Sequence, residues 1–296
     1  MTDEVKLEPL YSPNKEKPMN LAIFMSGTGS NAKKIIERYI EDRGRGSVSF
    51  EPKLMFSDNP SSNAHKIAQE TYKEKGVVVP FVLNPIREFY AKQGTDNLRD
   101  AGVREKYDKE QAKFLADYGI DAVALAGYDW VVTSIICENN LTINVHPGDL
   151  RVKDEKGKRK YTGLGWVPSA KSMLDGNTMF YTSVHLVTSE LDGGPLAAIS
   201  QPQYYAAHKG EENLFGEAKT LGDILKFIKA NPEAKDDDIT AKFSVYGHAK
   251  KVQELLKIWG DWVEFPQAIV NVALGNYQRD KEFRLHFKGK PIPNGI

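Results

Sequence analysis

The stretch that decides the fold of this chain is Leu21-Ala-Ile-Phe-Met-Ser-Gly-Thr-Gly-Ser-Asn31, an apolar run that leads directly into a glycine-rich loop. Apolar residues then recur at helical spacing, namely Ala32, Ile35, Ile36, Tyr39 and Ile40. A buried strand, a tight turn and an amphipathic helix in this order are typical of a parallel α/β sheet. We therefore predict that residues 21–40 open such a sheet.

The same alternation continues through the first half of the chain. Apolar runs predict further strands at residues 52–56, 77–83, 121–127 and 142–145. Apolar residues at helical spacing predict helices at residues 65–72 and 103–118. Continuous apolar strands that alternate with helices indicate a sheet covered on both faces. The expected fold class is α/β, with a Rossmann-like, mostly parallel sheet and helices on both faces.

Antiparallel structure is predicted in the second half. Residues 181–187 alternate in polarity, Asp192-Gly-Gly194 forms a turn, and residues 196–200 return as an apolar strand, which indicates a C-terminal hairpin addition to the sheet. Helices are expected at residues 221–230 and 239–259. Residues 265–274 suit a helix or a strand, and residues 283–291 suggest a last small hairpin.

The domain organisation follows from these segments. We predict a flexible lead-in over residues 1–18 and a single domain over residues 19–296. Three stretches resemble insertions into that domain, at about residues 85–102, 153–160 and 206–235. Their charge runs are most simply solvated loops, although Lys158, Arg159 and Lys160 could assist an anionic substrate.

Composition excludes several classes of protein. The 296 residues are 41% hydrophobic and 27% charged, and 40 basic residues balance 40 acidic ones, so no electrostatic footprint for nucleic acid or a membrane surface is present. The single cysteine, Cys137, excludes an intramolecular disulfide framework, suits a reducing compartment and is interpreted as a small buried hydrophobe. No apolar stretch approaches the ~20 residues of a membrane span. We expect a cytoplasmic protein.

The glycine-rich loop suggests a site for a phosphate group. The backbone amides of Gly27, Thr28, Gly29, Ser30 and Asn31 precede or begin a helix, where an anion is favoured. The spacing of Gly27, Gly29 and Ala32 also satisfies the dinucleotide pattern G-x-G-x-x-A, with Asp58 as a ribose ligand. A single phosphate and a nicotinamide dinucleotide are both open at this point.

Three polar residues at the ends of strands have the chemistry needed for acyl transfer. The His146 imidazole can move a proton near neutral pH, and the Asn144 amide can donate to a developing oxyanion. The Asp192 carboxylate can orient the imidazole and hold it charged. No serine or cysteine nucleophile accompanies them, which favours direct transfer between two bound substrates. No grouping of His, Cys and Asp has metal-ligand spacing, so no metal is expected.

Several motifs together resemble one family. In chain order they are Met25-Ser-Gly-Thr-Gly-Ser-Asn31, Arg104-Glu-Lys-Tyr-Asp108, Leu125-Ala-Gly-Tyr128, Ile143-Asn-Val-His-Pro147, Leu191-Asp-Gly-Gly-Pro195, Asp237-Asp-Ile-Thr-Ala241 and Lys288-Gly-Lys-Pro-Ile-Pro293. Their order resembles the folate-dependent glycinamide ribonucleotide formyltransferase family of purine synthesis. The resemblance spans about residues 19–293, interrupted by the three insertions.

The resemblance implies two small-molecule substrates, 10-formyltetrahydrofolate as co-substrate and a phosphorylated amine as acceptor. Asn144, His146 and Asp192 would then be catalytic, and residues 27–31 would hold the phosphate of the acceptor. Arg104 would lie on the folate side. The loop that wraps the pterin would comprise Tyr128, Asp129, Trp130, Val131 and Val132.

Departures from the family pattern concern mainly the acceptor. Ser244 and Gly247 stand where the family has a glutamine and a glutamate that hold the ribonucleotide, and Gly148 follows His146-Pro147 where the family has a serine. Formyl transfer to another phosphorylated amine, such as an amino sugar, and hydrolysis of 10-formyltetrahydrofolate are therefore alternatives. Outside the class remain a dinucleotide-binding oxidoreductase and a non-catalytic sensor. An exposed sheet edge could support a homodimer.

Overall fold

The computed structural model describes residues 6–14, 16–206 and 220–296. They divide into two compact units. Unit 1 comprises Met1–Val145, Val184–Ala198 and Glu264–Ile296, and unit 2 comprises His146–Ser183 and Ile199–Val263. The single domain expected over residues 19–296 stays a prediction.

A seven-stranded sheet has the strand order β4-β3-β2-β5-β6-β8-β9. The pairs β2–β3, β2–β5, β3–β4 and β5–β6 are parallel. This confirms the predicted α/β class with a mostly parallel sheet, and β8 and β9 add the predicted hairpin at its edge. The strands are β2 (Met19–Met25), β3 (Phe50–Ser57), β4 (Phe81–Leu83), β5 (Ala122–Leu125), β6 (Leu141–His146), β8 (Ser183–Leu186) and β9 (Leu196–Ile199).

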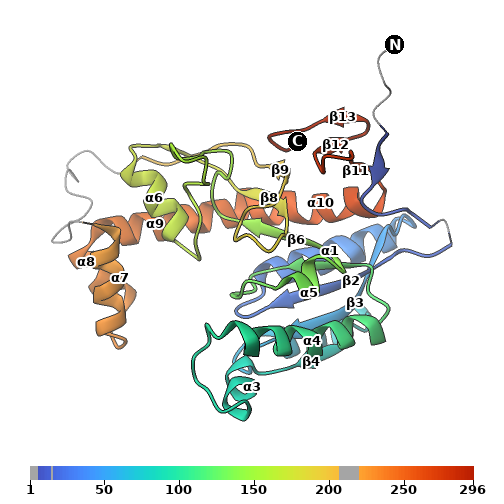
Figure 1. Ribbon diagram of the computed structural model, residues 1–296, viewed down its shortest axis with the longest axis horizontal. Helices are drawn as coiled ribbons and strands as arrows, with labels where there is room; N and C mark the ends of the chain where they lie inside the picture. Colours follow the sequence, from blue (N-terminus) through green and yellow to red (C-terminus); the bar gives the residue numbers. More distant parts are fainter. Residues whose placement is uncertain (1–5, 15, 207–219) are drawn as a thin grey trace. The chain divides into compact units, whose positions relative to one another are not determined.

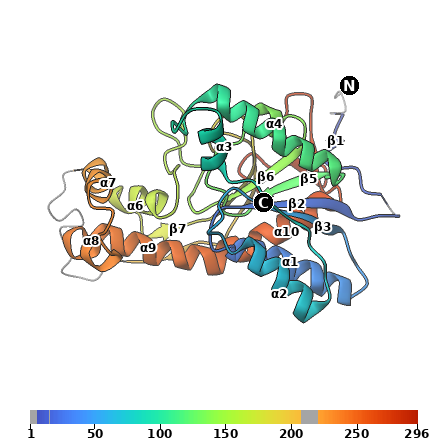
Figure 2. The same ribbon diagram turned by 90° about the horizontal axis from the view of Figure 1, so that it is seen from below.

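Helices cover both faces of this sheet, as Figures 1 and 2 show for unit 1. Side chains alternate along a strand, so Leu21 and Ile23 of β2 enter one core while Ala22 and Phe24 enter the other. The first core lies against α1 (Ser30–Gly44), α2 (Ala64–Lys75) and α10 (Trp262–Ala273). The second lies against α3 (Ile86–Lys92), α4 (Ala101–Asp117) and α5 (Ser134–Cys137).

A separate four-stranded antiparallel sheet joins the two ends of the chain. Its order is β1-β11-β12-β13, with β1 (Glu8–Pro9), β11 (Tyr277–Arg279), β12 (Leu285–Phe287) and β13 (Lys290–Pro291). The predicted last hairpin is therefore part of a larger sheet. Glu8 pairs with Arg279 and Pro9 with Gln278, so this part of the expected flexible lead-in is an ordered strand.

Unit 2 has its own helical core. It contains α6 (Val167–Leu174), α7 (Leu221–Ala230), α8 (Asp236–Lys242), α9 (Ser244–Leu256) and a π-helical turn at Lys257–Asp261. A short antiparallel pair, β7 (Met179–Phe180) with β10 (Gln203–Tyr204), completes it. Buried side chains that include Ile224, Val245 and Val252 form the core.

Two predicted elements differ from the structure, and three further segments are now defined. The strand expected at residues 77–83 is shortened to Phe81–Leu83, because Pro80 has no N–H to donate to a ladder. The helix expected at residues 239–259 is interrupted at Phe243, whose backbone is extended. Residues 265–274 are almost wholly helical, within α10. The insertion expected at residues 85–102 contains α3, and most of the one at residues 206–235 lies outside the described residues or in α7.

Candidate functional site

The glycine-rich loop connects β2 to the first turn of α1. Gly29 has φ 72°, and a Cβ there would lie 2.5 Å from Ile67 Cδ1 and 2.6 Å from the terminal methyl of Met25. The left-handed backbone therefore favours glycine, and a side chain here would also require Ile67 and Met25 to move. A Cβ on Gly27 would meet nothing within 4 Å. The Asn63 side-chain amide donates to the Thr28 carbonyl at 3.3 Å and the Asn63 backbone N–H to the Gly27 carbonyl at 3.1 Å, which holds the loop beside the start of a 15-residue helix. This arrangement favours an anion.

Asp58, at the end of β3, is a buried carboxylate with two donors. The Ser26 hydroxyl donates to one oxygen at 2.5 Å, and the indole Nε1–H of Trp130 donates to the other at 2.6 Å. Only 4% of Asp58 is exposed. Because the carboxylate is buried behind Ser26 and Trp130, a ribose hydroxyl could reach it only if these side chains moved, so the geometry does not favour the dinucleotide alternative.

The loop after β5 contains the residues expected to bind folate. The Ser26 N–H donates to the Gly127 carbonyl at 2.8 Å, and the Asp129 N–H donates to Ser26 Oγ at 3.0 Å. Tyr128 and Val132 are buried, whereas Val131 is 48% exposed. Hydrogen bonds with Ser26 thus hold the backbone of this loop, while Val131 remains exposed.

Arg104 lies beneath the same loop. It is buried on α4, and its Nη2–H donates to the Val131 carbonyl at 2.9 Å. Its Nε lies 3.4 Å from an Asp108 oxygen, and the Thr133 N–H donates to the other Asp108 oxygen at 2.6 Å. Burial raises the pKa of Asp108, although Arg104 and Thr133 act in the opposite direction. The contacts of Arg104 in the structure are to the loop backbone and to neighbouring side chains.

Asn144 and Asp192 both approach the same ring nitrogen of His185 within unit 1. The Asn144 side-chain amide donates to His185 Nε2 at 3.2 Å, and this nitrogen is 3.7 Å from Asp192 Oδ1. A carbonyl oxygen only accepts, so His185 Nδ1, 2.8 Å from the Leu186 carbonyl, carries the proton in this arrangement. The site residues predicted from the sequence do not include His185. Its position in Ser183-Val-His-Leu186, just before the Asp192 turn, is the signal that could identify it.

The Asp192 turn is sterically specific. Asp192 itself has φ 51°, a left-handed conformation that is uncommon outside glycine. A Cβ on Gly194 would lie 1.9 Å from the Leu186 carbonyl oxygen, so no larger residue fits this position. The Leu186 N–H in turn donates to the Pro195 carbonyl at 2.9 Å. These constraints set the direction of the Asp192 carboxylate, which is 8% exposed.

His146 belongs to unit 2 and is almost fully buried. Its Nε2–H donates to the Tyr161 carbonyl at 2.7 Å. A Cβ on Gly148 would lie 2.7 Å from that carbonyl oxygen and 2.9 Å from His146 Nε2, which explains why glycine replaces the serine of the family pattern. The Ser183 hydroxyl donates to the Gly148 carbonyl at 2.6 Å and fixes the turn after His146.

Ser244 and Gly247 lie on α9 of unit 2, at the positions expected to contact the acceptor. A Cβ on Gly247 would lie 2.4 Å from Thr240 Cγ2 on α8, so the close approach of these helices requires glycine. The glutamate of the family pattern therefore has no room here. His248 is buried and its Nδ1 lies 2.6 Å from the Tyr205 hydroxyl, which agrees with a structural role.

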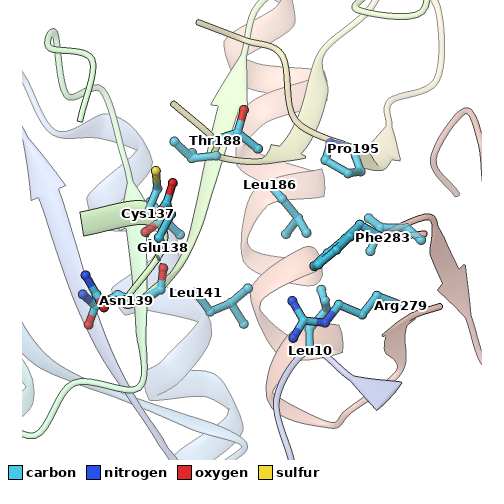
Figure 3. A pocket seen from close by; sticks show the side chains of 14 residues that line it. Leu10, Cys137, Glu138, Asn139, Leu141, Leu186, Thr188, Pro195, Arg279 and Phe283 are labelled. Atoms are coloured by element: carbon cyan, nitrogen blue, oxygen red, sulfur yellow. Dashed lines mark hydrogen bonds between the residues drawn. The ribbon is translucent and has the colours of Figure 1, made fainter. Parts of the chain in front are cut away.

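A cavity of about 480 Å³ occurs elsewhere in unit 1 (Figure 3). Arg279 and Phe283 line one side of it, and Cys137 and Glu138 line the other. Burial raises the pKa of the Cys137 thiol, so the uncharged thiol is favoured at neutral pH. The residues that line this cavity include none of those predicted for the site.

Within residues 6–14, 16–206 and 220–296, no group of three or more His, Cys, Asp or Glu side chains is arranged to hold a metal ion. No helix in those described ranges is both long enough and apolar enough to cross a membrane.

Comparisons with known proteins bear on the whole arrangement. The family profile described as "Formyl transferase" matches residues 19–220. The phosphoribosylglycinamide formyltransferase of Escherichia coli (strain K12) is 26% identical over 196 residues, which cover 66% of this chain and 77% of the relative. The matched range of the profile contains Asn144, His146 and Asp192.

Solved structures show the same fold. The phosphoribosylglycinamide formyltransferase of Coxiella burnetii, solved in complex with CHES, has a TM-score of 0.60 at 20% identity, covering 94% of this chain and 98% of its own. That of Anaplasma phagocytophilum has a TM-score of 0.60 at 15% identity, covering 94% and 97%.

Proposed function

Because this chain belongs to the formyl transferase family, we propose that it transfers a formyl group from 10-formyltetrahydrofolate to the amine of glycinamide ribonucleotide. The observation that carries this proposal is the family match over residues 19–220, which includes the three residues whose chemistry suits acyl transfer. The reaction belongs to de novo purine synthesis and would take place in the cytoplasm.

Each substrate has a proposed set of contacts. The backbone amides of residues 27–31 would hold the phosphate of the acceptor, supported by the steric need for Gly29 and by the helix start at Ser30. The pterin would lie against residues 128–132, whose backbone forms hydrogen bonds with the side chains of Arg104 and Ser26. Arg104 would act on folate through this loop.

The reaction is a direct transfer. The amine attacks the formyl carbon, a new C–N bond forms, the bond from that carbon to N10 of the folate breaks, and the proton lost by the amine passes to N10 through His146 or a bound water. Asn144 and His146 would stabilise the oxyanion, and Asp192 would keep His146 protonated. The ordered turns at Gly148 and Gly194 support precise positions for His146 and Asp192 within their own units.

One observation favours a second acceptor class. Gly247 packs so closely on Thr240 that a carboxylate side chain has no room there, so a contact expected for glycinamide ribonucleotide is missing. Losing one such hydrogen bond costs about 1–3 kcal/mol of binding when nothing replaces it. A different phosphorylated amine, such as an amino sugar, is therefore the alternative acceptor.

The proposal is tested by a spectroscopic assay of 10-formyltetrahydrofolate conversion with glycinamide ribonucleotide, with an amino-sugar phosphate and without acceptor. We expect turnover only with the ribonucleotide, and its loss by at least about 100-fold in His146→Ala. His65→Ala, an exposed histidine on α2, is the matched control and should retain activity. Turnover without acceptor would identify a hydrolase. Turnover only with the amino-sugar phosphate would show that this sugar, and not glycinamide ribonucleotide, is the acceptor.

A homodimer stays a prediction from the sequence. Sedimentation of the purified chain measures its mass in solution directly and distinguishes a monomer from a dimer.

A further inference from the structure

Three loops of unit 1 meet at one buried carboxylate. The strands β3, β2 and β5 are neighbours and parallel, so the loops at their carboxyl ends emerge at the same edge of the sheet. Each of these loops supplies one polar group to the same cluster: Ser26 after β2, Asp58 after β3 and Trp130 after β5. The cluster therefore ties together loops that are far apart in the sequence.

Two side-chain donors hold the buried Asp58 carboxylate in place. Asp58 forms no ion pair with Lys, Arg or His among the residues that the structure describes, although it is 4% exposed. Its carboxylate accepts from Ser26 at 2.5 Å and from Trp130 at 2.6 Å. A buried charge held only by such hydrogen bonds makes each of them strong and directional. Moving the indole would leave one oxygen without its donor.

The hydrogen bond between Trp130 and Asp58 fixes part of the loop after β5. Asp129, Trp130 and Val131 are consecutive, and each is anchored: the Asp129 N–H to Ser26, the Trp130 indole to Asp58 and the Val131 carbonyl to Arg104. The Arg104 guanidinium carbon also lies 5.6 Å from the Trp130 ring centroid, within the range of a cation–π contact. Val131 remains 48% exposed, so the anchored segment is available to a ligand.

We propose that Asp58 and Trp130 are a positioning pair, whose hydrogen bond holds residues 128–132 in the conformation that binds the pterin of the folate. This role rests on the proposed function. Neither side chain reacts: Asp58 is inaccessible, and the Trp130 N–H is already donated to it. Their effect is on folate affinity, through the backbone of the loop.

The test compares Asp58→Leu, which has no acceptor for the indole N–H, Trp130→Phe and the double variant with the wild type. Trp259→Phe, at an indole that is 59% exposed on unit 2, is the matched control. For each protein, KM for 10-formyltetrahydrofolate and kcat are measured, together with the equilibrium Kd for tetrahydrofolate by calorimetry. Melting temperatures identify any variant that does not fold. Asp58→Leu, which is close to aspartate in size, carries the test if Trp130→Phe fails to fold.

We expect each single variant to raise folate KM and the tetrahydrofolate Kd by about 10-fold while kcat changes by less than about 3-fold. The double variant should be no worse than either single one, because both remove the same bond. Unchanged folate KM and tetrahydrofolate Kd in the two single variants would contradict the positioning role of Asp58 and Trp130. Additive effects in the double variant would also contradict it.

Failure of the proposed function is distinguishable. A wild type that binds tetrahydrofolate but transfers to no amine contradicts the reaction, while its Kd series still decides the positioning role. A wild type that does not bind tetrahydrofolate overturns both.

Discussion

His185 is the residue that the structure adds to the candidate site. Its Nε2 accepts a hydrogen bond from the Asn144 amide and lies 3.7 Å from an Asp192 oxygen. With Nε2 unprotonated, the ring keeps the Asn144 amide oriented. The two residues predicted as catalytic in unit 1 are therefore linked through His185.

A first prediction at this scale concerns the two glycines of the phosphate loop. Gly29→Ala should lower the free energy of unfolding by about 1–3 kcal/mol, because its φ of 72° and its contact with Ile67 both oppose a side chain. Gly27→Ala meets no atom within 4 Å and should change stability by less than about 0.5 kcal/mol. Urea unfolding of the two variants measures the difference. Equal stabilities would contradict the conclusion that the loop conformation requires glycine at position 29 and not at position 27.

Much of the candidate site could be predicted from single residues, because residue type and chain order carry its chemistry. Asn144, Asp192 and the glycine loop are proposed on this basis. The bond between Asp58 and Trp130 could not be predicted, since it depends on which strands are neighbours. The burial of Arg104 could not be predicted for a related reason. The sequence of α4 does not show that the Arg104 guanidinium donates to the Val131 carbonyl of a distant loop.

At the scale of elements, the strands of the sheet were predictable and the breaks in helices were not. The runs around Ile23, Leu54 and Val123 are apolar over several residues and alternate with amphipathic helices, which is typical of strands buried on both faces. The break at Phe243 is set by tertiary packing, because an extended backbone there places its ring in the core of unit 2. Apolar residues keep their helical spacing on both sides of Phe243, so the sequence pattern does not reveal the break.

The C-terminal sheet carries a prediction about acid stability. Burial acts to raise the pKa of Asp280, but hydrogen bonds from Arg284, from backbone amides and from His286 outweigh it and hold the pKa well below its ordinary value. A carboxyl group of this kind stabilises the folded state above its unfolded pKa of about 3.9, and that contribution is lost as the pH falls further.

We therefore expect Asp280→Asn to melt at a lower temperature than the wild type at pH 6 and to lose less stability between pH 6 and pH 3. Melting curves of both proteins across this range measure the effect. An identical decline in the two proteins would show that other carboxyl groups dominate the acid response.

At the scale of the whole molecule, unit 1 is assembled from three separate stretches of the chain and unit 2 from two. Their cores are distinct: one group of buried side chains surrounds α9, and two others lie on opposite faces of the sheet. This division was not predictable, because hydrophobic periodicity identifies the faces of elements without showing which faces share a core.

A whole-molecule prediction concerns the N-terminal strand. Deleting residues 1–10 removes β1 and the bond from the Leu10 N–H to the Tyr277 carbonyl, 2.9 Å long. We expect faster hydrogen exchange at Tyr277–Arg279 and unchanged exchange at Phe81–Leu83, on the far edge of the large sheet. Deleting residues 1–5 leaves β1 in place and is the control; equal exchange in both deletions would contradict a structural role for this strand.

The pairing of β1 with β11 also sets the order of events at the ribosome. The first strand of the small sheet is synthesised almost a whole chain length before its partner, and the last residue, Ile296, donates its N–H to Ala197 at 3.1 Å. Unit 1 can therefore complete this sheet only after residues 277–291 have been synthesised, when every residue of unit 2 has already been made. We expect a nascent chain stalled before residue 277 to expose β1 without its partner strand, and therefore to be cleaved there by proteases more readily than the full chain.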